Sequence, residues 1–262
     1  MKEKKTSLAG IIGRERSVAV ACSGGVDSTL VLKTSCDVLG AENVLAVFVD
    51  TPLLPTGENE AVRETVRHIG CRLHIVRLDP LAWPDFIANP KDRCYLCKKR
   101  IYRILQAELA GSNIHVFFDG TNLDDLSDDR PGLKALKELG VRTPLAEVGL
   151  TKKDVRRLSR DLNLPTWNKL SSSCLATRIA HPQKITQEKL DLIQKCESFL
   201  KSIGYQGCRV RISNDSAMIE LLEDDIKSFV QAETRQQVVK MFNDYAMERV
   251  FVNIAGRLGI VL

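Results

Sequence analysis

SVAVACSGGVDSTLVLKTSCDVLG, residues 17–40, is the stretch that decides the fold. A short apolar run over 17–22 leads into the turn Ser23–Gly24–Gly25, and from Val26 apolar residues recur with helical spacing until Gly40. A strand, a glycine turn and a helix in this order direct successive backbone N–H groups toward an anion at the positive end of the helix. The stretch therefore predicts a phosphate-binding loop after a buried strand.

This loop differs from two common nucleotide-binding patterns. It has neither the lysine of a Walker A loop nor the spaced glycines of the dinucleotide fingerprint. The plainer alternative is an ordinary strand-to-helix turn built from Ser and Gly. The flanking strand and helix favour the phosphate loop.

The same alternation continues along the chain. Apolar runs at 44–50, 72–79 and 115–120 indicate buried strands, and helical spacing is found at 58–70 and 98–111. Strands that alternate with helices predict an α/β fold in which a parallel sheet carries helices on both faces. Ligands of such sheets bind at the carboxyl ends of the strands.

The C-terminal third has a different character. A Thr–x–x–Asp helix start opens the segment 151–165, which ends at a proline, and a loop with Pro182 near its end follows. We therefore predict one domain over 1–182 and a small α+β domain over 183–262. The elements expected in the second domain are a helix at 186–204, a hairpin formed by CRVRIS and AMIELL, a helix at about 222–243 and a strand at 249–255.

Composition limits the functional classes. The 262 residues are 44% hydrophobic and 27% charged, and neither a long apolar run nor a signal peptide is present, so we expect a cytoplasmic protein without a membrane span. The net charge of +5 suits an anionic substrate without requiring a nucleic acid. Eight scattered cysteines indicate reduced thiols with metal or catalytic roles rather than a disulfide framework.

Four further motifs narrow the family. They are GTNLDDLSDDRPG (120–132), NPKDRCYLCK (89–98), WNKLSSSCLATRI (167–179) and CRVR (208–211). Together with the SGGVDS loop, and in this order from about residue 10 to the C-terminus, they resemble the LarE family of the PP-loop ATP pyrophosphatase superfamily. The resemblance implies an adenine nucleotide alpha hydrolase-like fold. It also implies an ATP- and Mg²⁺-dependent sulfurtransferase that adenylates a pyridinium carboxylate mononucleotide, releases pyrophosphate and forms a thiocarboxylate for nickel-pincer cofactor biosynthesis.

The resemblance also assigns binding residues. Those implied for ATP are Ser23, Gly24, Gly25, Val26, Asp27, Ser28, Asp50, Asp125 and Arg178, and those implied for the substrate phosphate are Arg209, Arg211 and Glu197. Asp50 is equally explained as a cap for the following turn. The two arginines of CRVR alternate on a strand and so share one face, which an exposed basic edge would also explain.

The resemblance implies that cysteines carry out the sulfur chemistry. Cys174 lies in LSSSCLATR, a stretch with neither helical nor strand periodicity, and matches the reactive cysteine of the LarE family. Arg178 is placed to lower the pKa of this thiol or to hold a phosphate. The C-x-x-C pair Cys94 and Cys97 supplies two further thiolates, which with Cys174 form a ligand set for a [4Fe–4S] cluster. The other cysteines are predicted to pack in the core: Cys22, Cys36, Cys71, Cys196 and Cys208.

Three interpretations of these thiols stay open. A cluster ligated by three cysteines supplies sulfide from its open iron. In the sacrificial alternative, Cys174 gives up its own sulfur and becomes dehydroalanine. The third is that these thiols bind zinc, form a redox disulfide between Cys94 and Cys97, or are inert.

Rival functions also remain. A tRNA thiolase of the same superfamily uses a similar cysteine layout, although Val26 stands where such enzymes usually carry lysine and little chain precedes the first strand. A non-catalytic iron–sulfur or nucleotide-sensing protein is the second rival. The LarE resemblance further implies a homo-oligomer, a hexamer, and leaves room for a sulfide donor protein; nucleic acid is not expected as a partner.

Overall fold

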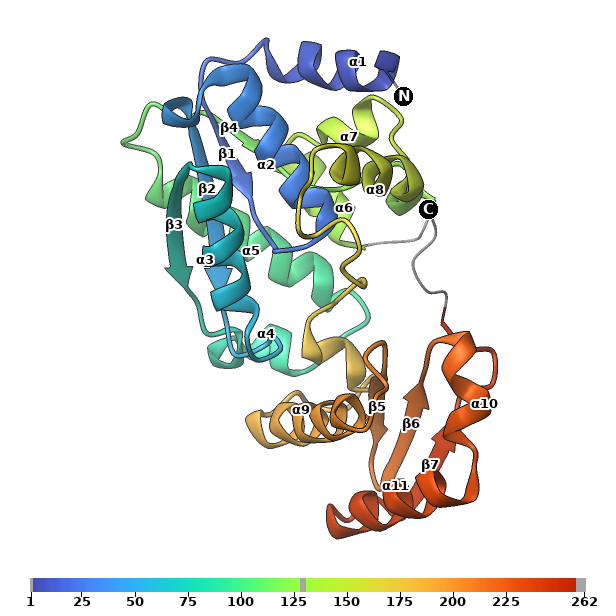
Figure 1. Cartoon of the computed structure of the whole chain (residues 1–262). Coiled ribbons are helices and arrows are strands. Elements are labelled where there is room, and N and C mark those ends of the chain that lie inside the picture. Colours follow the sequence, from blue (N-terminus) through green and yellow to red (C-terminus); the bar gives the residue numbers. More distant parts are fainter. Residues whose placement is uncertain (1, 128–130, 258–262) are drawn as a thin grey trace.

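The computed structural model describes residues 2–127 and 131–257 (Figure 1). Asp128, Asp129 and Arg130 of the 120–132 motif lie outside the described residues, as do the last five positions of the predicted second domain, 258–262. Within the described ranges, no helix combines the length and the apolar character needed to cross a membrane.

A parallel sheet of four strands organises the N-terminal part. The strands are β1 (Val18–Ala21), β2 (Val44–Asp50), β3 (Arg72–Arg77) and β4 (Val116–Phe118), in the order β3-β2-β1-β4. The chain therefore builds outward from β1 through β2 to β3 and then crosses to the other side of β1 for β4. This reversal makes the gap beyond the carboxyl ends of β1 and β4 the topological switch point, where α/β sheets bind ligands.

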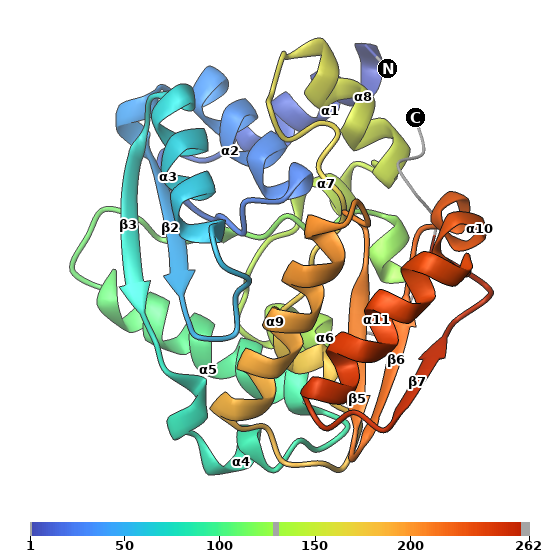
Figure 2. The same ribbon diagram turned by 60° about the horizontal axis from the view of Figure 1, so that its bottom comes forward.

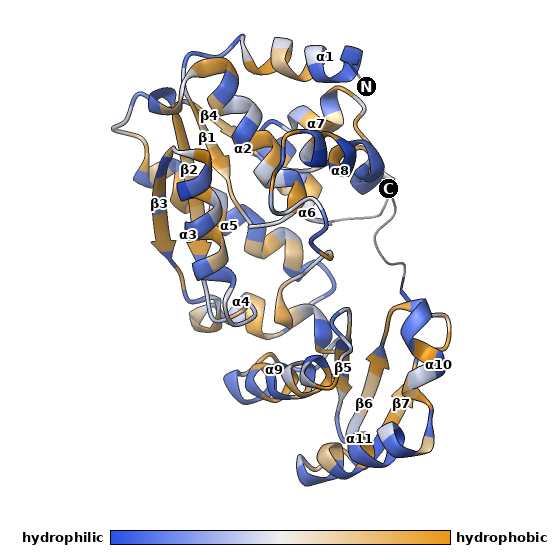
Figure 3. Cartoon of the chain, viewed as in Figure 1, coloured by the Kyte–Doolittle hydropathy of each residue, from blue (hydrophilic) through white to orange (hydrophobic). Residues whose placement is uncertain are grey.

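Helices cover both faces of this sheet, so the predicted α/β fold is confirmed. Side chains of β1 alternate between the faces: Val18 and Val20 pack with one apolar cluster, whereas Ala19 packs with another. The first cluster is covered by α1 (Lys2–Ile12), α2 (Val26–Leu39), α3 (Glu58–Ile69) and α8 (Lys152–Asp161), and the second by α5 (Arg93–Glu108) and α6 (Pro131–Glu138). Figure 3 shows hydrophobic strands between helices whose outward faces are polar.

Local signals explain several boundaries. At the start of α8, the Thr151 side chain accepts a hydrogen bond from the backbone of Asp154, whose carboxylate accepts one in return, which forms a capping box. At the end of α3, Gly70 adopts a left-handed conformation (φ 87°) that ends the helix. The remaining short helices are α4 (Pro84–Ile87), α7 (Pro144–Glu147) and α10 (Ile226–Phe229), with 3₁₀ turns at Ala41–Asn43, Pro80–Ala82, Asp124–Leu126, Leu175–Arg178 and Glu223–Asp225.

Two predicted helices differ from the structure. The helix expected at 98–111 begins at Arg93, so α5 carries both cysteines of the C-x-x-C motif in its first turns. The helix expected at about 222–243 is divided into α10 and α11 (Ala232–Asp244), because Gln231 has an extended backbone (ψ 148°). The division lets Phe229 and Phe242 both pack into one core.

The C-terminal part holds a second, three-stranded sheet (Figure 2). Strands β5 (Arg209–Ser213) and β6 (Ser216–Glu220) form the predicted antiparallel hairpin, and β7 (Arg249–Val252) pairs with β6 in parallel. Helices α9 (Gln187–Ser202) and α11 pack on this sheet. The same core also includes Leu53, Phe86 and Leu175, which precede residue 182. The domain boundary at residue 182 therefore stays a prediction.

Candidate active site

The loop Ser23–Ser28 joins β1 to α2 and is held by its own contacts. The Ser28 Oγ accepts a hydrogen bond from the Ser23 N–H at 3.1 Å. Gly24 has φ 71°, and a Cβ at this position would lie 2.7 Å from Cγ2 of Val62. Glycine is thus required both by the left-handed backbone and by the close packing of α3. The loop is therefore shaped before any ligand binds.

A cavity of about 690 Å³ opens at this loop, at the switch point of the sheet. Its walls come from segments far apart in the sequence: Ser23, Gly25, Val26 and Asp27; Leu54, Pro55 and Glu58; Asn122, Asp124, Asp125 and Ser127; Lys152; Lys169 to Cys174; and Arg209. The cavity therefore brings together four of the five sequence motifs, all but NPKDRCYLCK, and the start of α8. Predicted site residues from both sheets meet in it.

A second cavity of about 460 Å³ adjoins the first and shares Ser23, Asp27, Leu54, Asp125 and Ser172 with it. Its walls include Val47, Phe48 and Val49 at the end of β2 and Ile101, Tyr102 and Leu105 of α5. At its floor, a Cβ on Gly120 would lie 2.7 Å from the Ser28 N, so β4 ends in close contact with the first turn of α2. A cavity beside a phosphate loop that combines apolar walls with polar side chains such as Lys98 and Asp119 has the size and chemistry for a nucleoside base.

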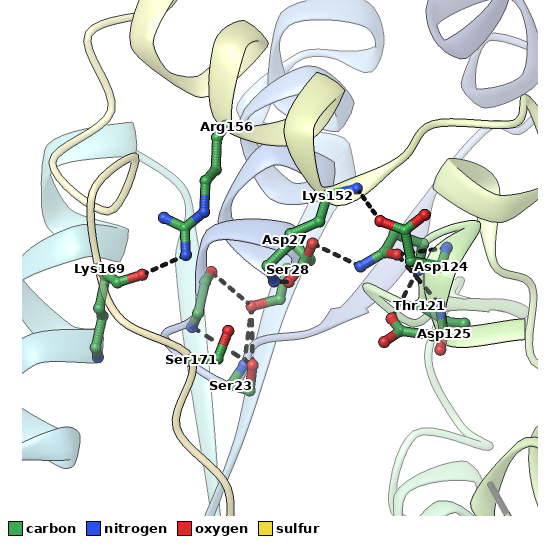
Figure 4. A network of polar contacts seen from close by, with 12 residues as sticks. Ser23, Asp27, Ser28, Thr121, Asp124, Asp125, Lys152, Arg156, Lys169 and Ser171 are labelled. Carbon is green, nitrogen blue, oxygen red and sulfur yellow. Dashed lines mark hydrogen bonds and ion pairs between the residues drawn. The ribbon is translucent and has the colours of Figure 1, made fainter. Parts of the chain in front are cut away.

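Carboxylates gather at the mouth of the loop (Figure 4). Asp27 accepts a hydrogen bond from the Asn122 Nδ2 at 3.1 Å and is ion-paired with Lys152. Asp124 accepts a hydrogen bond from the Lys152 N–H at 2.8 Å, and Asp125 accepts one from the Asn122 N–H at 3.0 Å. Mg²⁺ in nucleotide sites binds one or two carboxylates together with phosphate oxygens. The donor set of this cluster fits that ion.

Two lysines, Lys152 and Lys169, line this side of the cavity, and a buried arginine holds the segment that carries Lys169. Lys169 donates to the Gly24 carbonyl at 3.2 Å and pairs with Glu58 at 2.7 Å. Arg156 is buried and donates to the carbonyls of Trp167 and Lys169, at 2.8 and 2.9 Å, which fixes the segment that follows α8. Lys152, Arg156 and Lys169 were not predicted as site residues from the sequence. Lys152 belongs to the TKKD helix start and Lys169 to the WNK motif, but only the fold shows that these two lysines reach the loop. Arg156 lies two residues beyond TKKD and contacts the segment that carries Lys169.

Cys174 lines the main cavity directly before the 3₁₀ turn Leu175–Arg178. The Leu175 N–H donates to the Leu53 carbonyl at 2.8 Å, which anchors the cysteine segment to the loop after β2. Burial raises the pKa of the Cys174 thiol, the Cys94 thiolate raises it further, and the positive charges of Arg93 and Arg178 oppose the shift only in part. In the ligand-free chain this thiol is therefore protonated at neutral pH.

Arg178 lies beneath the cysteine segment. Its Nε contacts the Glu197 carboxylate at 3.0 Å, and both side chains are buried. Its Nη1 donates to the carbonyls of Ser173 and Cys174, at 2.9 and 3.2 Å. The structure thus places Arg178 and Glu197 as a buried pair that holds the cysteine segment in shape.

The C-x-x-C pair lies near Cys174. Cys94 is exposed and Cys97 is partly buried, both in the first turns of α5. Burial raises the pKa of Cys97 to about 12, and the negative charges of Cys174 and Cys94 contribute to that shift. The three predicted thiols are therefore close enough for their charges to shift one another's pKa values. Across residues 2–127 and 131–257, no three His, Cys, Asp or Glu side chains are arranged to hold a single metal ion.

A buried polar network holds these two cysteine segments together. The Asn89 Nδ2 donates to the Gln183 carbonyl at 2.7 Å and to the Ala180 carbonyl at 3.2 Å. Arg93, also buried, contacts the Asn89 Oδ1 and donates to the Ile179 carbonyl at 3.4 Å. Asn89 and Arg93 belong to the NPKDRC motif, yet no sequence signal indicates this role, because their partners are backbone carbonyls about 90 residues away.

A basic pocket of about 360 Å³ extends the main cavity toward the C-terminal sheet. Its basic side chains are Lys169, Arg178, Lys201, Arg209 and Arg257. Burial and the nearby positive charges of Arg257 and Arg178 lower the pKa of Arg209 to about 10. Within the described part of the chain, the buried Arg209 Nε has no hydrogen-bond partner. Concentrated positive charge with an unused donor fits a phosphate group.

Two predicted residues lie away from these cavities. Arg211 pairs with Glu220 at 2.6 Å and donates to the Thr177 carbonyl at 2.8 Å, so its guanidinium braces the hairpin. Asp50 accepts a hydrogen bond from the Asn59 Nδ2 at 2.7 Å and borders a separate hollow with Arg77 and Asp79. Neither residue borders the cavities that contain the phosphate loop.

Comparison with known proteins supplies the family. No family model matches the chain. Over 256 residues it is 37% identical to an uncharacterized protein of Synechocystis sp., covering 98% of this chain and 95% of that one. Over 227 residues it is 36% identical to the pyridinium-3,5-bisthiocarboxylic acid mononucleotide synthase of Lactiplantibacillus plantarum, a LarE protein, covering 87% of this chain and 82% of that one.

A more distant match supports the superfamily. One chain of the glutamine-hydrolyzing GMP synthase of Archaeoglobus fulgidus is 25% identical over 204 residues, which cover 72% of this chain and 65% of that one. The match agrees with the parallel sheet and the SGGVDS loop. With the LarE identity spread over most of both chains, the chain belongs to the LarE family of the PP-loop superfamily.

Proposed function

We propose that this chain is an ATP-dependent sulfurtransferase that adenylates a pyridinium carboxylate mononucleotide and converts it to a thiocarboxylate during nickel-pincer nucleotide cofactor biosynthesis. Membership of the LarE family supports the reaction class. The observation that carries the proposal is that Cys174 and the phosphate loop line one cavity. A nucleophilic sulfur and an activated carboxylate need such a shared space, because they must approach within contact distance.

ATP occupies the two adjoining cavities in this proposal. The base lies between the end of β2 and α5, and the phosphates lie at the loop Ser23–Ser28, where the backbone N–H groups and the α2 dipole stabilise negative charge. One or two of the carboxylates of Asp27, Asp124 and Asp125 would hold Mg²⁺ together with phosphate oxygens, and the bound ion would neutralise charge on the phosphates. Lys152 and Lys169 lie within reach of the same phosphates and exchange their carboxylate partners for them.

The mononucleotide substrate occupies the basic pocket. Arg209, with its unused Nε, and Arg257 bind the phosphate there, and the shared wall of residues 169–172 leads from this pocket into the main cavity. The pyridinium carboxylate then points toward the α-phosphate of ATP and toward Cys174. Attack by the carboxylate on that phosphorus forms the acyl adenylate and releases pyrophosphate. Asp50 and Arg211 are not assigned to this reaction.

The sulfur source is the finer part of the proposal. Cys94, Cys97 and Cys174 would hold a [4Fe–4S] cluster, which when bound supplies a sulfide from its open iron. The charges of Cys94, Cys97 and Cys174 act on one another, which supports this assignment because a cationic metal centre would relieve the repulsion between three neighbouring thiolates. In such a cluster each cysteine would bind a different iron, so the three sulfurs would lie farther apart than the ligands of a single metal ion. The sacrificial use of the Cys174 sulfur is the competing source.

The LarE resemblance also suggests a role for the C-terminal part, an oligomeric state and a cellular location. We propose that residues 183–262 form the substrate-binding and oligomerisation domain, that the chain assembles as a homo-oligomer, a hexamer by family resemblance, and that it works in the cytoplasm. A sulfide donor protein would reload the cluster. Size-exclusion chromatography with light scattering tests the assembly, and a monomer would contradict it.

A product assay tests the function. The purified chain is incubated anaerobically with MgATP and a carboxylated pyridinium mononucleotide, and pyrophosphate, AMP and thiocarboxylate are measured. We expect all three products, and expect them equally from Lys153→Ala, which changes an exposed lysine next to Lys152. Absence of pyrophosphate with every carboxylated pyridine nucleotide would contradict the proposal. Tight, steeply salt-dependent filter binding of bulk tRNA would instead favour the alternative, a PP-loop tRNA thiolase that uses an iron–sulfur cluster.

A further inference from the structure

One serine lies where three cavities meet. Ser172 borders the main cavity at the phosphate loop, the second cavity between the end of β2 and α5, and the basic pocket. Among the residues that the structure describes, it is the one residue that all three cavities share. The sequence assigns it no role, because it is the middle one of three consecutive serines and such a run is typical of an exposed loop. Its place at the junction follows from the fold.

The chain on either side of Ser172 is held in place. The Ser171 carbonyl accepts a hydrogen bond from the Arg209 Nη2 at 3.0 Å. The Ser173 carbonyl and hydroxyl both accept hydrogen bonds from the Arg178 Nη1, at 2.9 and 2.5 Å. The two neighbours therefore fix the position of Ser172, and its own side chain is not needed to hold the segment.

The Ser172 hydroxyl is available to a ligand. Ser172 is exposed, and within residues 2–127 and 131–257 its hydroxyl has no hydrogen-bond partner. A serine hydroxyl carries one donor that rotates toward an acceptor. An exposed serine of any surface loop shares these properties, and the place of Ser172 at the junction of three cavities distinguishes it from such a serine. An unused donor on a fixed segment is suited to stabilise charge that develops in a reaction.

The acyl adenylate of the proposed reaction spans the same three cavities. Its adenosine lies in the second cavity, its phosphate lies at the loop Ser23–Ser28, and its mononucleotide half lies in the basic pocket. The carboxyl carbon that joins the two halves then lies where the cavities meet, beside Ser172, and Cys174 lines the main cavity two residues further along the chain. This placement rests on the proposed function, because it requires both nucleotides to occupy these cavities.

We propose that Ser172 is a catalytic residue of sulfur transfer, whose hydroxyl donates a hydrogen bond to the carbonyl oxygen of the acyl adenylate. A lone pair of the sulfur nucleophile, a sulfide or a thiolate, forms the S–C bond, and the C=O π electrons move onto the oxygen. The Ser172 hydroxyl stabilises this negative charge. The C=O bond then re-forms, the bond from the carboxyl carbon to the phosphate oxygen breaks, and AMP leaves with that electron pair. The mononucleotide keeps the sulfur, as a thiocarboxylate or as a thioester.

Separate measurement of the two half-reactions tests this role. The full chain, purified anaerobically, is mixed with MgATP and a carboxylated pyridinium mononucleotide, and single turnovers are quenched and analysed by chromatography. Ser172→Ala should keep pyrophosphate release within about threefold of the parent but should lower the rate of thiocarboxylate formation about 100-fold, the cost of losing one donor to a developing oxyanion. The acyl adenylate should therefore accumulate in this variant, and hydroxylamine should trap it as a hydroxamate in larger amount than in the parent.

Two further variants separate the effect of the hydroxyl from a change in the fold. Ser172→Thr keeps the hydroxyl and should keep the rate of thiocarboxylate formation within about tenfold of the parent. Ser202→Ala, which removes an exposed hydroxyl at the end of α9 outside the three cavities, should match the parent. The iron content and the urea midpoint of Ser172→Ala should equal those of the parent.

The possible failures are distinguishable. A parent chain that releases no pyrophosphate would contradict the proposed function, and with it the role of Ser172. A parent chain that forms thiocarboxylate, together with a Ser172→Ala variant that forms it at the same rate, would overturn the role of Ser172 alone. Loss of pyrophosphate release or of iron in Ser172→Ala, to the same extent as thiocarboxylate formation, would also overturn it, because the serine would then act in binding or in the fold.

Discussion

Two sides of the main cavity are built in different ways: the phosphate-loop side, formed by Ser23–Ser28, and the cysteine side, formed by the segment around Cys174 and the start of α5. Six consecutive residues, Ser23–Ser28, shape the loop, and their contacts are mainly local. The cysteine side joins α5 to the segment around Cys174, and the buried side chains of Arg93 and Asn89 connect the two through the backbone carbonyls of residues 179–183. The loop therefore depends on the conformation of a few backbone positions, whereas the cysteine side depends on buried contacts between distant segments.

The largest expected effect separates the chemistry of the two sides. Cys174→Ala should lower thiocarboxylate formation at least about 1,000-fold, because it removes a cluster ligand or the nucleophile itself, but should keep substrate-dependent pyrophosphate release within about tenfold. Asp27→Asn should lose both products, since it removes a carboxylate from the loop mouth. Both products are measured by chromatography. If both variants lost pyrophosphate release equally, adenylation would not be confined to the phosphate-loop side and sulfur transfer would not be confined to the cysteine side.

The second effect concerns the buried pair under the cysteine segment. Arg178→Met leaves the Glu197 carboxylate buried without its partner, so the free energy of unfolding should fall by about 3–5 kcal/mol. Urea denaturation measures the change. Arg249→Met, which breaks an exposed pair with Asp215, is the control and should change stability by less than about 1 kcal/mol. A similar, small change in both variants would show that the buried pair does not hold the cysteine side together.

The third effect concerns the backbone of the loop. Gly24→Ala places a Cβ against Val62 at a left-handed φ, so the free energy of unfolding should fall by about 1–3 kcal/mol and ATP affinity should weaken. Gly10→Ala, in the helix α1 with open space around it, should instead stabilise the chain by about 0.5–1 kcal/mol. Calorimetric titration with a non-hydrolysable ATP analogue gives the affinities. Unchanged binding by the Gly24 variant would contradict a preformed loop.

The smallest expected effect is a pH dependence of stability and of thiol reactivity at Cys97, on the cysteine side. The folded-state pKa of Cys97 lies at about 12, above its ordinary value of 9.0, so the protonated thiol is favoured by folding. The associated stability is complete below pH 9 and is lost as the pH rises toward 12. In the metal-free chain, alkylation of Cys97 should therefore keep accelerating above pH 9, which mass spectrometry can follow. A plateau near pH 8.5 would contradict the effect of burial.

The same comparison explains which features can be predicted from the sequence. The strand β2 at 44–50 and the hairpin around Asn214 follow from local apolar runs and turn residues, and both match the structure. The loop Ser23–Ser28 is equally local. Lys152, Arg156 and Asn89 were missed because their partners come from other elements, and a single sequence carries no trace of such contacts. Asp50 and Arg211 were assigned by resemblance; in the structure they contact Asn59 and Glu220 and do not border the cavities of the phosphate loop, so their roles stay predictions.

Iron and sulfide analysis after anaerobic purification tests most directly whether the three thiols and the phosphate loop form one reaction centre. The parent chain should carry about four irons and four sulfides, and Cys97→Ala should carry almost none. During turnover with MgATP and the pyridinium substrate, the intact mass of the parent should not change. A colourless, iron-free parent that loses about 34 Da on turnover, the mass change from cysteine to dehydroalanine, would contradict the cluster and show that Cys174 is the sulfur donor.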